Sequence, residues 1–217
     1  MRDGRPLSGQ GANCTERVVE IPWVLRHLPP RVGRLLDIGT AFAPVAYQRE
    51  LVRLAADERH GVDLADFALR GVVAHRADVR ALPFADGVFD RVVCISTLEH
   101  IGLDNERYFA PDGRPLDEQG DLTALRELGR VTAPGGRVLV TVPAGVACTR
   151  DWYRQYDAEA WTGLAERAGL AVERLDCFEH DAARGWQACP PEALPLRDYE
   201  QGAVASAAVI CSELRPR

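Results

Sequence analysis

The sequence predicts an α/β protein built on a mainly parallel β-sheet with helices on both faces. The first observation is that short apolar runs of strand length alternate with segments whose apolar residues recur at helical spacing. Strand–helix–strand order is typical of a parallel sheet, because the crossover helices cover its faces. The second observation is that the last two apolar runs are joined by a loop and not by a helix, which indicates an antiparallel edge.

The first predicted element in chain order is an amphipathic helix over Thr15–Leu28, interrupted near Pro22 and ended by Pro29 and Pro30. Later apolar runs predict strands at Arg34–Ile38, His60–Val62, Val72–Ala77, Arg91–Ile95, Arg137–Val142, Ala171–Phe178 and Ala203–Cys211. Helical stretches are expected between the early strands, and the apolar spacing indicates helices at Pro44–Ala56, Asp121–Val131 and Asp157–Ala168. The motif Pro134-Gly135-Gly136 predicts the turn that leads from a helix into the fifth strand.

Length and composition fit one globular domain, since the chain has 217 residues and 47% of them are hydrophobic. Residues 1–13 contain three glycines and few apolar side chains, so we expect a disordered N-terminal arm before a single domain over residues 14–217. Residues 102–120 and 182–197 are predicted to be long loops, which often carry function.

Arginine supplies all 26 basic side chains, because the sequence contains no lysine. This excludes Schiff-base enzymes, P-loop proteins and protein kinases, each of which needs a lysine. The net charge of −6 argues against a nucleic-acid partner. The longest apolar run, residues 138–148, is too short to span a membrane, and the polar N-terminus has no signal-peptide region. The six cysteines are scattered, which predicts reduced thiols in a cytoplasmic protein.

Candidate ligand-binding residues stand at the ends of the first three predicted strands. Asp37 and Gly39 close the first strand, and the small residues after them would let a ligand approach the backbone closely. Asp63 ends the second strand, where one carboxylate could accept hydrogen bonds from both hydroxyls of a ribose. Asp78 ends the third strand and could accept from an adenine amino group. Taken alone, each also fits an ordinary loop or tight turn.

The fourth predicted strand ends in Ser96 and Thr97, and Glu99 and His100 follow directly. A histidine at the mouth of a cleft titrates near neutral pH and could act as a general base. An isolated histidine at such a position is more often structural, so this residue carries no function by itself.

In this order and spacing, the motifs resemble those of the class I S-adenosylmethionine-dependent methyltransferases. The resemblance covers roughly residues 15–217. It is carried by the segments Leu36-Asp37-Ile38-Gly39, Asp63, Ala77-Asp78, Leu82-Pro83-Phe84, Phe89-Asp90, Ser96-Thr97-Leu98-Glu99-His100-Ile101 and Pro134-Gly135-Gly136. Residues 16–23 are similar to the leading helix of a bacterial branch that acts on small molecules such as sugars and secondary metabolites.

The resemblance implies a Rossmann-like, doubly wound sheet of seven strands, mostly parallel with an antiparallel last strand, and S-adenosyl-L-methionine as the cofactor. It implies that helix 15–28 acts as a lid over the cofactor. The cofactor-binding residues that it implies are Arg17, Asp37, Gly39, Thr40, Ala41, Asp63, Leu64, Asp78, Val79, Ser96 and Thr97. Arg17 is assigned to the cofactor carboxylate because a guanidinium pairs well with that group.

One departure from the family pattern concerns the loop after the first strand, which usually reads Gly-x-Gly-x-Gly. Ala41 and Ala43 replace the second and third glycines here. Each methyl group narrows the space near the cofactor and disfavours a positive φ. Weaker cofactor binding, or its loss, is therefore an open alternative.

The resemblance implies methyl transfer to a small-molecule acceptor, and we expect O-methylation of a hydroxyl on a natural product or sugar. His100 is the expected general base, with Glu99 orienting it. Four aromatic residues are candidate acceptor contacts, namely Trp152, Tyr153, Tyr156 and Trp186. No metal site is expected, because the acidic residues of the segment 104–121 fit a solvated loop.

Several alternatives stay open at this point. They are N-methylation of a small molecule, a degenerate protein that binds the cofactor without catalysis, an RNA methyltransferase and a nicotinamide-dependent oxidoreductase. The oxidoreductase needs Gly-x-Gly-x-x-Gly, whereas this chain has Ala41 and Pro44 at the second and third glycines. Assembly as a homodimer also stays open.

Overall fold

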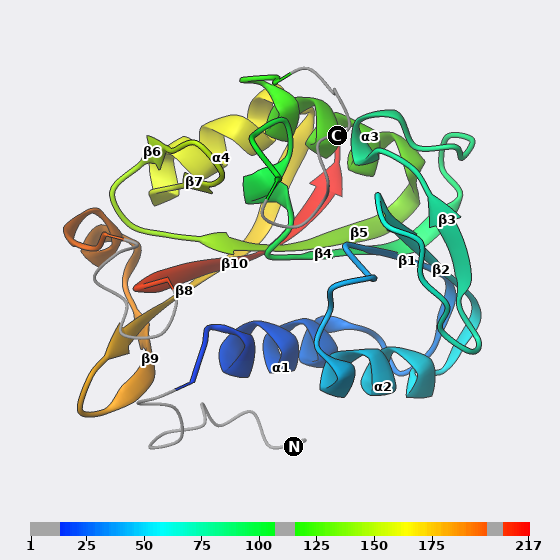
Figure 1. Ribbon diagram of the computed structural model, residues 1–217, viewed down its shortest axis with the longest axis horizontal. Helices are drawn as coiled ribbons and strands as arrows, with labels where there is room; N and C mark the ends of the chain where they lie inside the picture. The colour runs from blue at the N-terminus through cyan, green and yellow to red at the C-terminus, as the bar shows by residue number, and fades with distance from the viewer. Residues whose placement is uncertain (1–13, 107–115, 199–205) are drawn as a thin grey trace.

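The computed structural model describes residues 14–106, 116–198 and 206–217. A mixed sheet forms the middle layer, with two helices on each face (Figure 1). The helices are α1 (Arg17–His27), α2 (Val45–Arg53), α3 (Gly120–Val131) and α4 (Ala158–Arg167). The α/β class and the mainly parallel sheet with antiparallel C-terminal strands are therefore confirmed.

The main sheet has eight strands in the order β3-β2-β1-β4-β5-β10-β8-β9. They are β1 (Val32–Ile38), β2 (Ala56–Asp63), β3 (Val73–Arg76), β4 (Phe89–Ile95), β5 (Thr132–Pro143), β8 (Leu170–Asp181), β9 (Gly185–Cys189) and β10 (Ala208–Pro216). Strands β1 to β5 are parallel, and β10 runs antiparallel to both β5 and β8. A separate hairpin pairs β6 (Cys148–Thr149) with β7 (Arg154–Gln155).

Strand β9 corrects the expected seven-stranded sheet, since it adds an eighth strand antiparallel to β8. Residues 182–197 are therefore not an irregular loop, because β9 and the 3₁₀ helix η3 (Pro191–Leu196) occupy most of them. The strand forms because Trp186 is buried against the sheet and α1. Five residues are too few for a clear alternating pattern, so the sequence does not reveal this strand.

Three other expectations need correction. Helix α1 continues through Pro22, which costs only the hydrogen bond to the carbonyl of Val18, while the buried Trp23 and Val24 anchor the helix on the sheet. No helix lies between β2 and β3, and only the 3₁₀ turn η1 (Val79–Ala81) lies between β3 and β4, within the described residues. Strand β10 begins at Ala208, and the predicted residues 203–205 and the arm 1–13 lie outside the described part.

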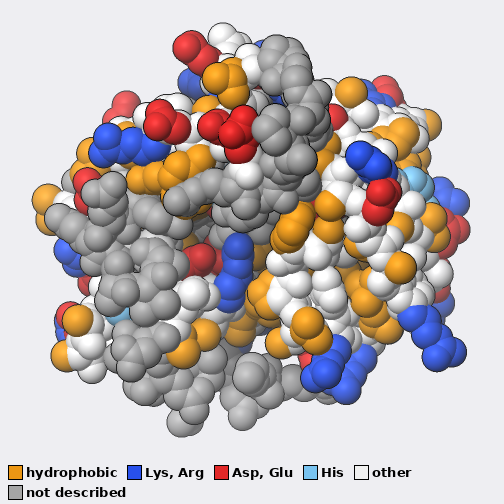
Figure 2. All heavy atoms as spheres, in the orientation of Figure 1, with side chains coloured by type: hydrophobic (Ala, Val, Ile, Leu, Met, Phe, Trp, Pro, Cys, Tyr) orange, Lys and Arg blue, Asp and Glu red, His pale blue; other side chains and the backbone are white. Residues whose placement is uncertain are grey.

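The core consists of two clusters, one on each face of the sheet. Helices α3 and α4 pack on one face, where Leu125, Leu128 and Trp161 are fully buried. Helices α1 and α2 pack on the other face, where Val24 and Leu51 meet strand residues of β1, β4 and β5. In the part of the chain that the structure describes, no helix is long and apolar enough to cross a membrane. Figure 2 shows acidic and basic side chains interspersed over the described part of one face.

Candidate functional site

A cavity opens where the parallel strands β1, β2, β3 and β4 end, and α1 contributes to its wall. Ligands of open α/β sheets bind in this position, outside the carboxyl ends of the strands. Most of the predicted cofactor residues line it, namely Arg17, Asp37, Gly39, Asp63, Leu64, Asp78, Val79, Ser96 and Thr97, together with His100. Thr40, Ala41 and Glu99 are on the same segments but do not line the cavity.

Gly39 is the residue at which β1 turns toward α2. Its φ is +82°, a left-handed conformation that glycine adopts without strain. A Cβ atom at this position would lie 2.3 Å from Oγ1 of Thr97. Only glycine therefore fits between the ends of β1 and β4, and its lack of a side chain keeps the cavity open.

Asp37 is a fully buried carboxylate just before this turn. Its Oδ1 accepts a hydrogen bond from Tyr47 (2.5 Å), and its Oδ2 accepts one from Thr40 (2.8 Å). Burial raises the pKa of Asp37 to about 6, even though both hydroxyl donors favour the ionised form. Asp37 thus holds the loop after β1 in place by connecting it to α2.

Ala41 and Ala43 cause no backbone strain. Among the described non-glycine residues, Ser96 alone has a positive φ, so the expected penalty at the two alanines is absent. The backbone N–H of Ala41 donates to Oδ2 of Asp63 (2.9 Å). The loop that contains the two alanines therefore has a structural role, because its backbone orients the carboxylate of Asp63 at the end of β2.

Asp63 is held by two backbone donors, because Ala65 also donates to its Oδ1 (3.1 Å). Its side chain lines the cavity, and each carboxylate oxygen has a second lone pair for a further donor. A diol is a ligand that this arrangement suits. Leu64, next in the chain, adds an apolar part to the lining.

Asp78 caps the turn η1 by accepting from the backbone N–H of Arg80 (2.9 Å). The guanidinium of Arg80 also pairs with it, at 2.8 Å. Val79 is buried beside it. The structure therefore places an oriented carboxylate and an apolar side chain at the end of β3, and their assignment to an adenine stays a prediction.

Ser96 and Thr97 form the end of β4. Ser96 has a φ of +38°, which is unusual for a residue with a side chain and often marks a functional site. Its hydroxyl donates to Oε1 of Glu20 on α1 (2.6 Å). Thr97 donates through Oγ1 to the carbonyl of Ile95 (3.0 Å). The hydrogen bond to Glu20 ties α1 to the sheet at the edge of the cavity.

Arg17 reaches the cavity from the first turn of α1. Its guanidinium pairs with Glu20 at 2.7 Å. Burial acts to lower the pKa of Arg17, but the carboxylates of Glu20, Glu16 and Glu99 outweigh it and raise the pKa. The predicted cofactor ligand is therefore already partnered by α1, although a guanidinium has five N–H donors in all.

His100 and Glu99 lie on the short turn η2 (Leu98–His100). Nδ1 of His100 lies 2.7 Å from the carbonyl oxygen of Trp152, so this nitrogen must carry the hydrogen of a neutral ring. Nε2, the remaining nitrogen, is 3.7 Å from Oε1 of Glu99. Glu99 is buried, and burial raises its pKa well above the ordinary value. A histidine oriented in this way can accept a proton at Nε2.

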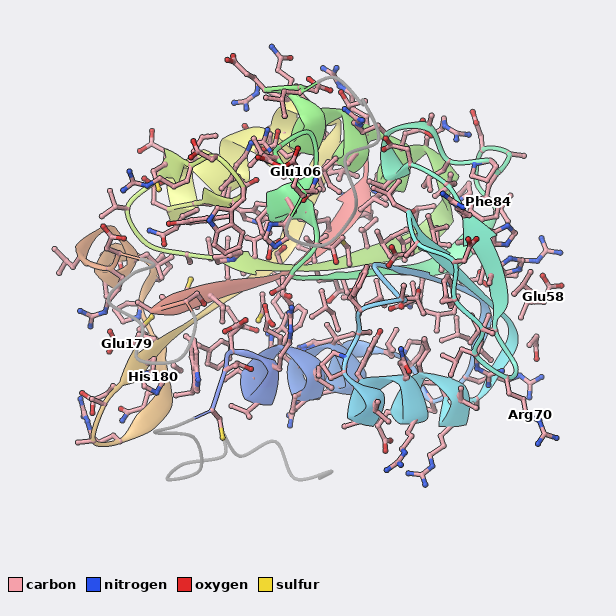
Figure 3. All side chains as sticks on the ribbon, in the orientation of Figure 1. Glu58, Arg70, Phe84, Glu106, Glu179 and His180 are labelled. Carbon is pink, nitrogen blue, oxygen red and sulfur yellow. The ribbon has the colours of Figure 1, made fainter. Side chains whose placement is uncertain are left out.

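The four predicted aromatic residues separate into two groups. Trp152 stacks on His100, with ring centroids 5.5 Å apart, and Tyr153 packs edge-on against Trp152. Tyr156 is buried in the core and donates to Asp121 (2.9 Å). Trp186 donates to the carbonyl of Cys14 and packs against His180, which Figure 3 shows at the β8–β9 end of the sheet. None of the four aromatic residues lines the cavity, and only Trp152 and Tyr153 lie next to His100, which does.

Sequence reasoning missed Glu16 and Glu20, which lie on the first turn of α1 beside Arg17. The spacing of Glu16, Arg17 and Glu20 was a signal, because charges three and four residues apart share one face of a helix. It also missed Tyr47, whose helix position gives no hint of a polar partner. Within the described residues, no group of three or more histidine, cysteine or acidic side chains is arranged to hold a metal.

Comparisons with known proteins agree with this geometry. A family model described as "Methyltransferase domain" matches residues 34–140. A curated protein of Mycolicibacterium paratuberculosis, demethylmenaquinone methyltransferase, is 31% identical over 176 residues. That alignment covers 78% of this chain, which spans 66% of the length of that relative.

Solved structures share the fold at low identity. The 1,6-didemethyltoxoflavin-N1-methyltransferase of Burkholderia thailandensis, solved with its acceptor and S-adenosylhomocysteine, superposes with a TM-score of 0.60 at 13% identity. The alignment covers 91% of this chain and 77% of that one. The [4+2]-cyclase SpnF gives 0.61 at 17% identity, over 90% and 79% of the two chains. At this identity the likeness concerns the fold alone, and the cyclase illustrates that one fold serves different reactions.

Proposed function

This chain belongs to the class I S-adenosylmethionine-dependent methyltransferases, and from that premise we propose that it methylates a small-molecule acceptor. The observation that carries the proposal is the cavity at the ends of β1 to β4, where Gly39, Asp63, Asp78 and His100 line one continuous space. A ligand with a diol, an amino-substituted ring and a charged tail fits the donors and acceptors along this line.

The residues at the strand ends fit S-adenosylmethionine. Asp63 would hold the ribose hydroxyls, Asp78 and Val79 the adenine, and the region around Gly39 the methionine part. When bound, this cofactor supplies an electrophilic methyl group on a sulfonium centre. Helix α1 serves as the lid, since Arg17 and Ile21 line the cavity from this helix.

His100 is the proposed general base for an acceptor hydroxyl. The carbonyl of Trp152 holds Nδ1–H, so Nε2 keeps the lone pair that would accept the proton. Trp152 stacks on His100 next to the cavity and is the proposed stacking partner of a flat acceptor. The related enzyme of M. paratuberculosis is named for demethylmenaquinone, which favours a ring-containing acceptor for this chain as well.

Titration calorimetry with S-adenosylhomocysteine tests the cofactor site. We expect Asp63→Asn to weaken binding by about tenfold or more, because an amide offers one acceptor oxygen instead of two. Asp66→Asn is the matched control, since Asp66 is exposed and pairs with Arg76 at the surface. Absence of binding to the unaltered chain, or equal binding to NAD, would overturn the proposal.

A screen of hydroxyl and amine acceptors with a labelled methyl donor tests the reaction itself. Once an acceptor is found, we expect His100→Gln to lower kcat by about a hundredfold or more while cofactor affinity stays unchanged. Full turnover in His100→Gln would remove the base assignment. Turnover with amines alone would replace O-methylation by N-methylation. Cofactor binding without any turnover would favour the degenerate, non-catalytic alternative.

A further inference from the structure

Three carboxylates surround a single guanidinium at one end of the cavity. Glu16 and Glu20 come from the start of α1, and Glu99 comes from the turn after β4. Glu20 and Glu99 are buried, and Arg17 is the cation that the three share. Ionised together, these side chains would leave two uncompensated negative charges in a space shielded from water.

Two of the three carboxylates have an oxygen without a hydrogen-bond donor. Glu20 is satisfied, because it accepts from Arg17 at one oxygen and from Ser96 at the other. Oε2 of Glu99 and Oε2 of Glu16 are buried and have no partner. The hydroxyl of Ser206, a residue whose backbone contacts the Glu16 carboxylate, has none either. Buried acceptors of this kind are costly to leave unpaired and indicate a donor that binds there.

The cluster adjoins the cavity at its wall. Oε1 of Glu99 lies 3.7 Å from Nε2 of His100, and His100 lines the cavity. Arg17, which pairs with Glu20, lines the cavity as well. A ligand beside His100 is therefore next to a site that contains more acceptors and negative charge than the chain itself satisfies.

The cluster lies at the β4 side of the predicted cofactor contacts and adjoins two of them, because Arg17 and Ser96 both hydrogen-bond to Glu20. Asp78, Asp63 and Gly39 follow β3, β2 and β1, which are neighbours in the sheet. The cluster lies one step further, at β4 and under the start of α1. Asp78, Asp63 and Gly39 are assigned to the adenine, ribose and methionine parts of the cofactor, so the acceptor is expected on the β4 side, beside His100.

We propose that this cluster binds a protonated amino group of the acceptor, so that the substrate is a small molecule carrying an ammonium group. An ammonium group brings three N–H donors and one positive charge. The unpaired oxygens of Glu99 and Glu16 need donors, and the cluster lacks positive charge. A neutral hydroxyl supplies one donor and no charge, and a carboxylate or phosphate would be repelled. The inference rests on the proposed function and names the substrate class for the same cavity.

The test uses the full chain saturated with S-adenosylhomocysteine and two probes of the same shape. The probes are 2-phenylethylammonium and its neutral analogue 2-phenylethanol, whose binding is measured by calorimetry or ligand-observed NMR. We expect the unaltered protein to prefer the ammonium by about tenfold or more, the usual advantage of a charge-assisted hydrogen bond. We expect Glu99→Gln and Glu16→Gln each to reduce this preference to less than about threefold.

Glu106→Gln is the matched control, because Glu106 is an exposed glutamate on the loop after η2, labelled in Figure 3. It should leave the preference unchanged. Circular dichroism of each variant confirms that it is folded, and the second glutamine variant serves if the first is not. A preference that survives in both folded glutamine variants would overturn the inference.

Two further outcomes would also overturn it. One is equal binding of the two probes, or no ammonium binding at about 20 mM, by a protein that binds S-adenosylhomocysteine. The other is a parallel loss of S-adenosylhomocysteine affinity in the glutamine variants, which would assign the cluster to the amino group of the cofactor. Failure to bind S-adenosylhomocysteine at all would instead defeat the proposed function. The two failures are therefore distinguishable.

Discussion

The two ends of the cavity treat their carboxylates in opposite ways. At the β2 end, Asp63 accepts hydrogen bonds from the backbone of Ala41 and Ala65 and still faces the cavity. At the β4 end, Glu99 is buried with one oxygen unpaired, and two further glutamates lie nearby. Both carboxylates are almost inaccessible to water, at 7% and 2% exposure.

This difference shows how far the carboxylate at each end of the cavity is oriented and hydrogen-bonded before a ligand binds. The backbone of the chain fixes Asp63, so a ligand there finds an oriented acceptor whose cost of burial is already offset. Glu99 keeps one oxygen, Oε2, without a donor, so its burial is tolerated either by protonation or by a bound cation. The carboxylate at the β2 end is thus satisfied by the protein itself, whereas the carboxylate at the β4 end still lacks a hydrogen-bond donor.

The largest expected effect concerns the glycine that keeps the β1 end open. Gly39→Ala should weaken S-adenosylhomocysteine binding by about a hundredfold or more, since its new Cβ would collide with Thr97 as well as strain the backbone. Gly71→Ala is a close control, because Gly71 has nearly the same φ, +81°, and nothing within 4 Å of the added atom. Calorimetry on both variants separates the effect of the contact with Thr97 from the effect of backbone strain. Equal affinities of the two variants for S-adenosylhomocysteine would show that the ends of β1 and β4 can accommodate the added methyl group.

The raised pKa of Asp37 should make the free energy of unfolding depend on pH. The folded protein holds this proton more tightly than the unfolded chain, because the pKa rises from 3.8 to about 6 on folding. Stability therefore falls as pH rises from about 4 to about 6, by about 3 kcal/mol from this group alone.

Tyr47→Phe tests this account, because it removes a donor to the ionised carboxylate. It should cost about 1–3 kcal/mol at pH 7 and clearly less at pH 4, where Asp37 is protonated. Urea unfolding at both pH values measures the difference. An equal cost at pH 4 and pH 7 would contradict the assigned role of Asp37.

Replacing Asp63 or Glu99 by the corresponding amide is expected to affect stability differently. Asp63→Asn should lower the free energy of unfolding by about 1–3 kcal/mol at pH 8, because one of two backbone donors loses its acceptor. Glu99→Gln should leave it unchanged or raise it at pH 8.

The reason for the Glu99 result is that its pKa is raised in the folded state. Ionisation of Glu99 then destabilises the fold as pH rises above the ordinary glutamate range, and glutamine removes this contribution. Urea unfolding of both variants from pH 4 to pH 8 checks the signs. Equal losses in the two variants would erase the distinction between the two ends of the cavity.

The smallest expected effect is at Trp152, which stacks on His100. Trp152→Leu should weaken binding of 2-phenylethylammonium by about three- to tenfold, the range of one aromatic contact. Leu196→Ala, at a highly exposed position outside the cavity, is the control. No change in Trp152→Leu would exclude direct stacking on the acceptor.

Local sequence patterns were enough to predict much of the β1–β3 end. Apolar runs of strand length indicated the strands, and Gly39, Asp63 and Asp78 stand directly at their ends. Because parallel strands bring their carboxyl ends to one edge, residues at those ends meet whatever the details of packing. The backbone support of Asp63 by Ala41 was not foreseen, because the alanines looked only like lost glycines.

The β4 end depended on contacts that no local pattern reveals. Glu20 meets Ser96 across 76 positions of sequence, and this meeting depends on how α1 packs on the sheet. Trp152 and Trp186 looked alike in the sequence, yet Trp152 stacks on His100 whereas Trp186 belongs to β9 and packs against His180. Strand β9 has only five residues, so its alternation of apolar and polar side chains was too short to predict a strand.

The sequence by itself therefore determined the order of the strands other than β9 in the main sheet, the four helices and the glycine turn after β1, because these follow from local periodicity and from single residues such as Gly39. Only the tertiary structure decided which side chains of α1 face the end of β4. That choice depends on the rotation and position of a helix on a sheet, which the whole buried interface sets. Helix α1, which the sequence predicts to be a lid, therefore also places the acidic side chains of Glu16 and Glu20 beside the cavity.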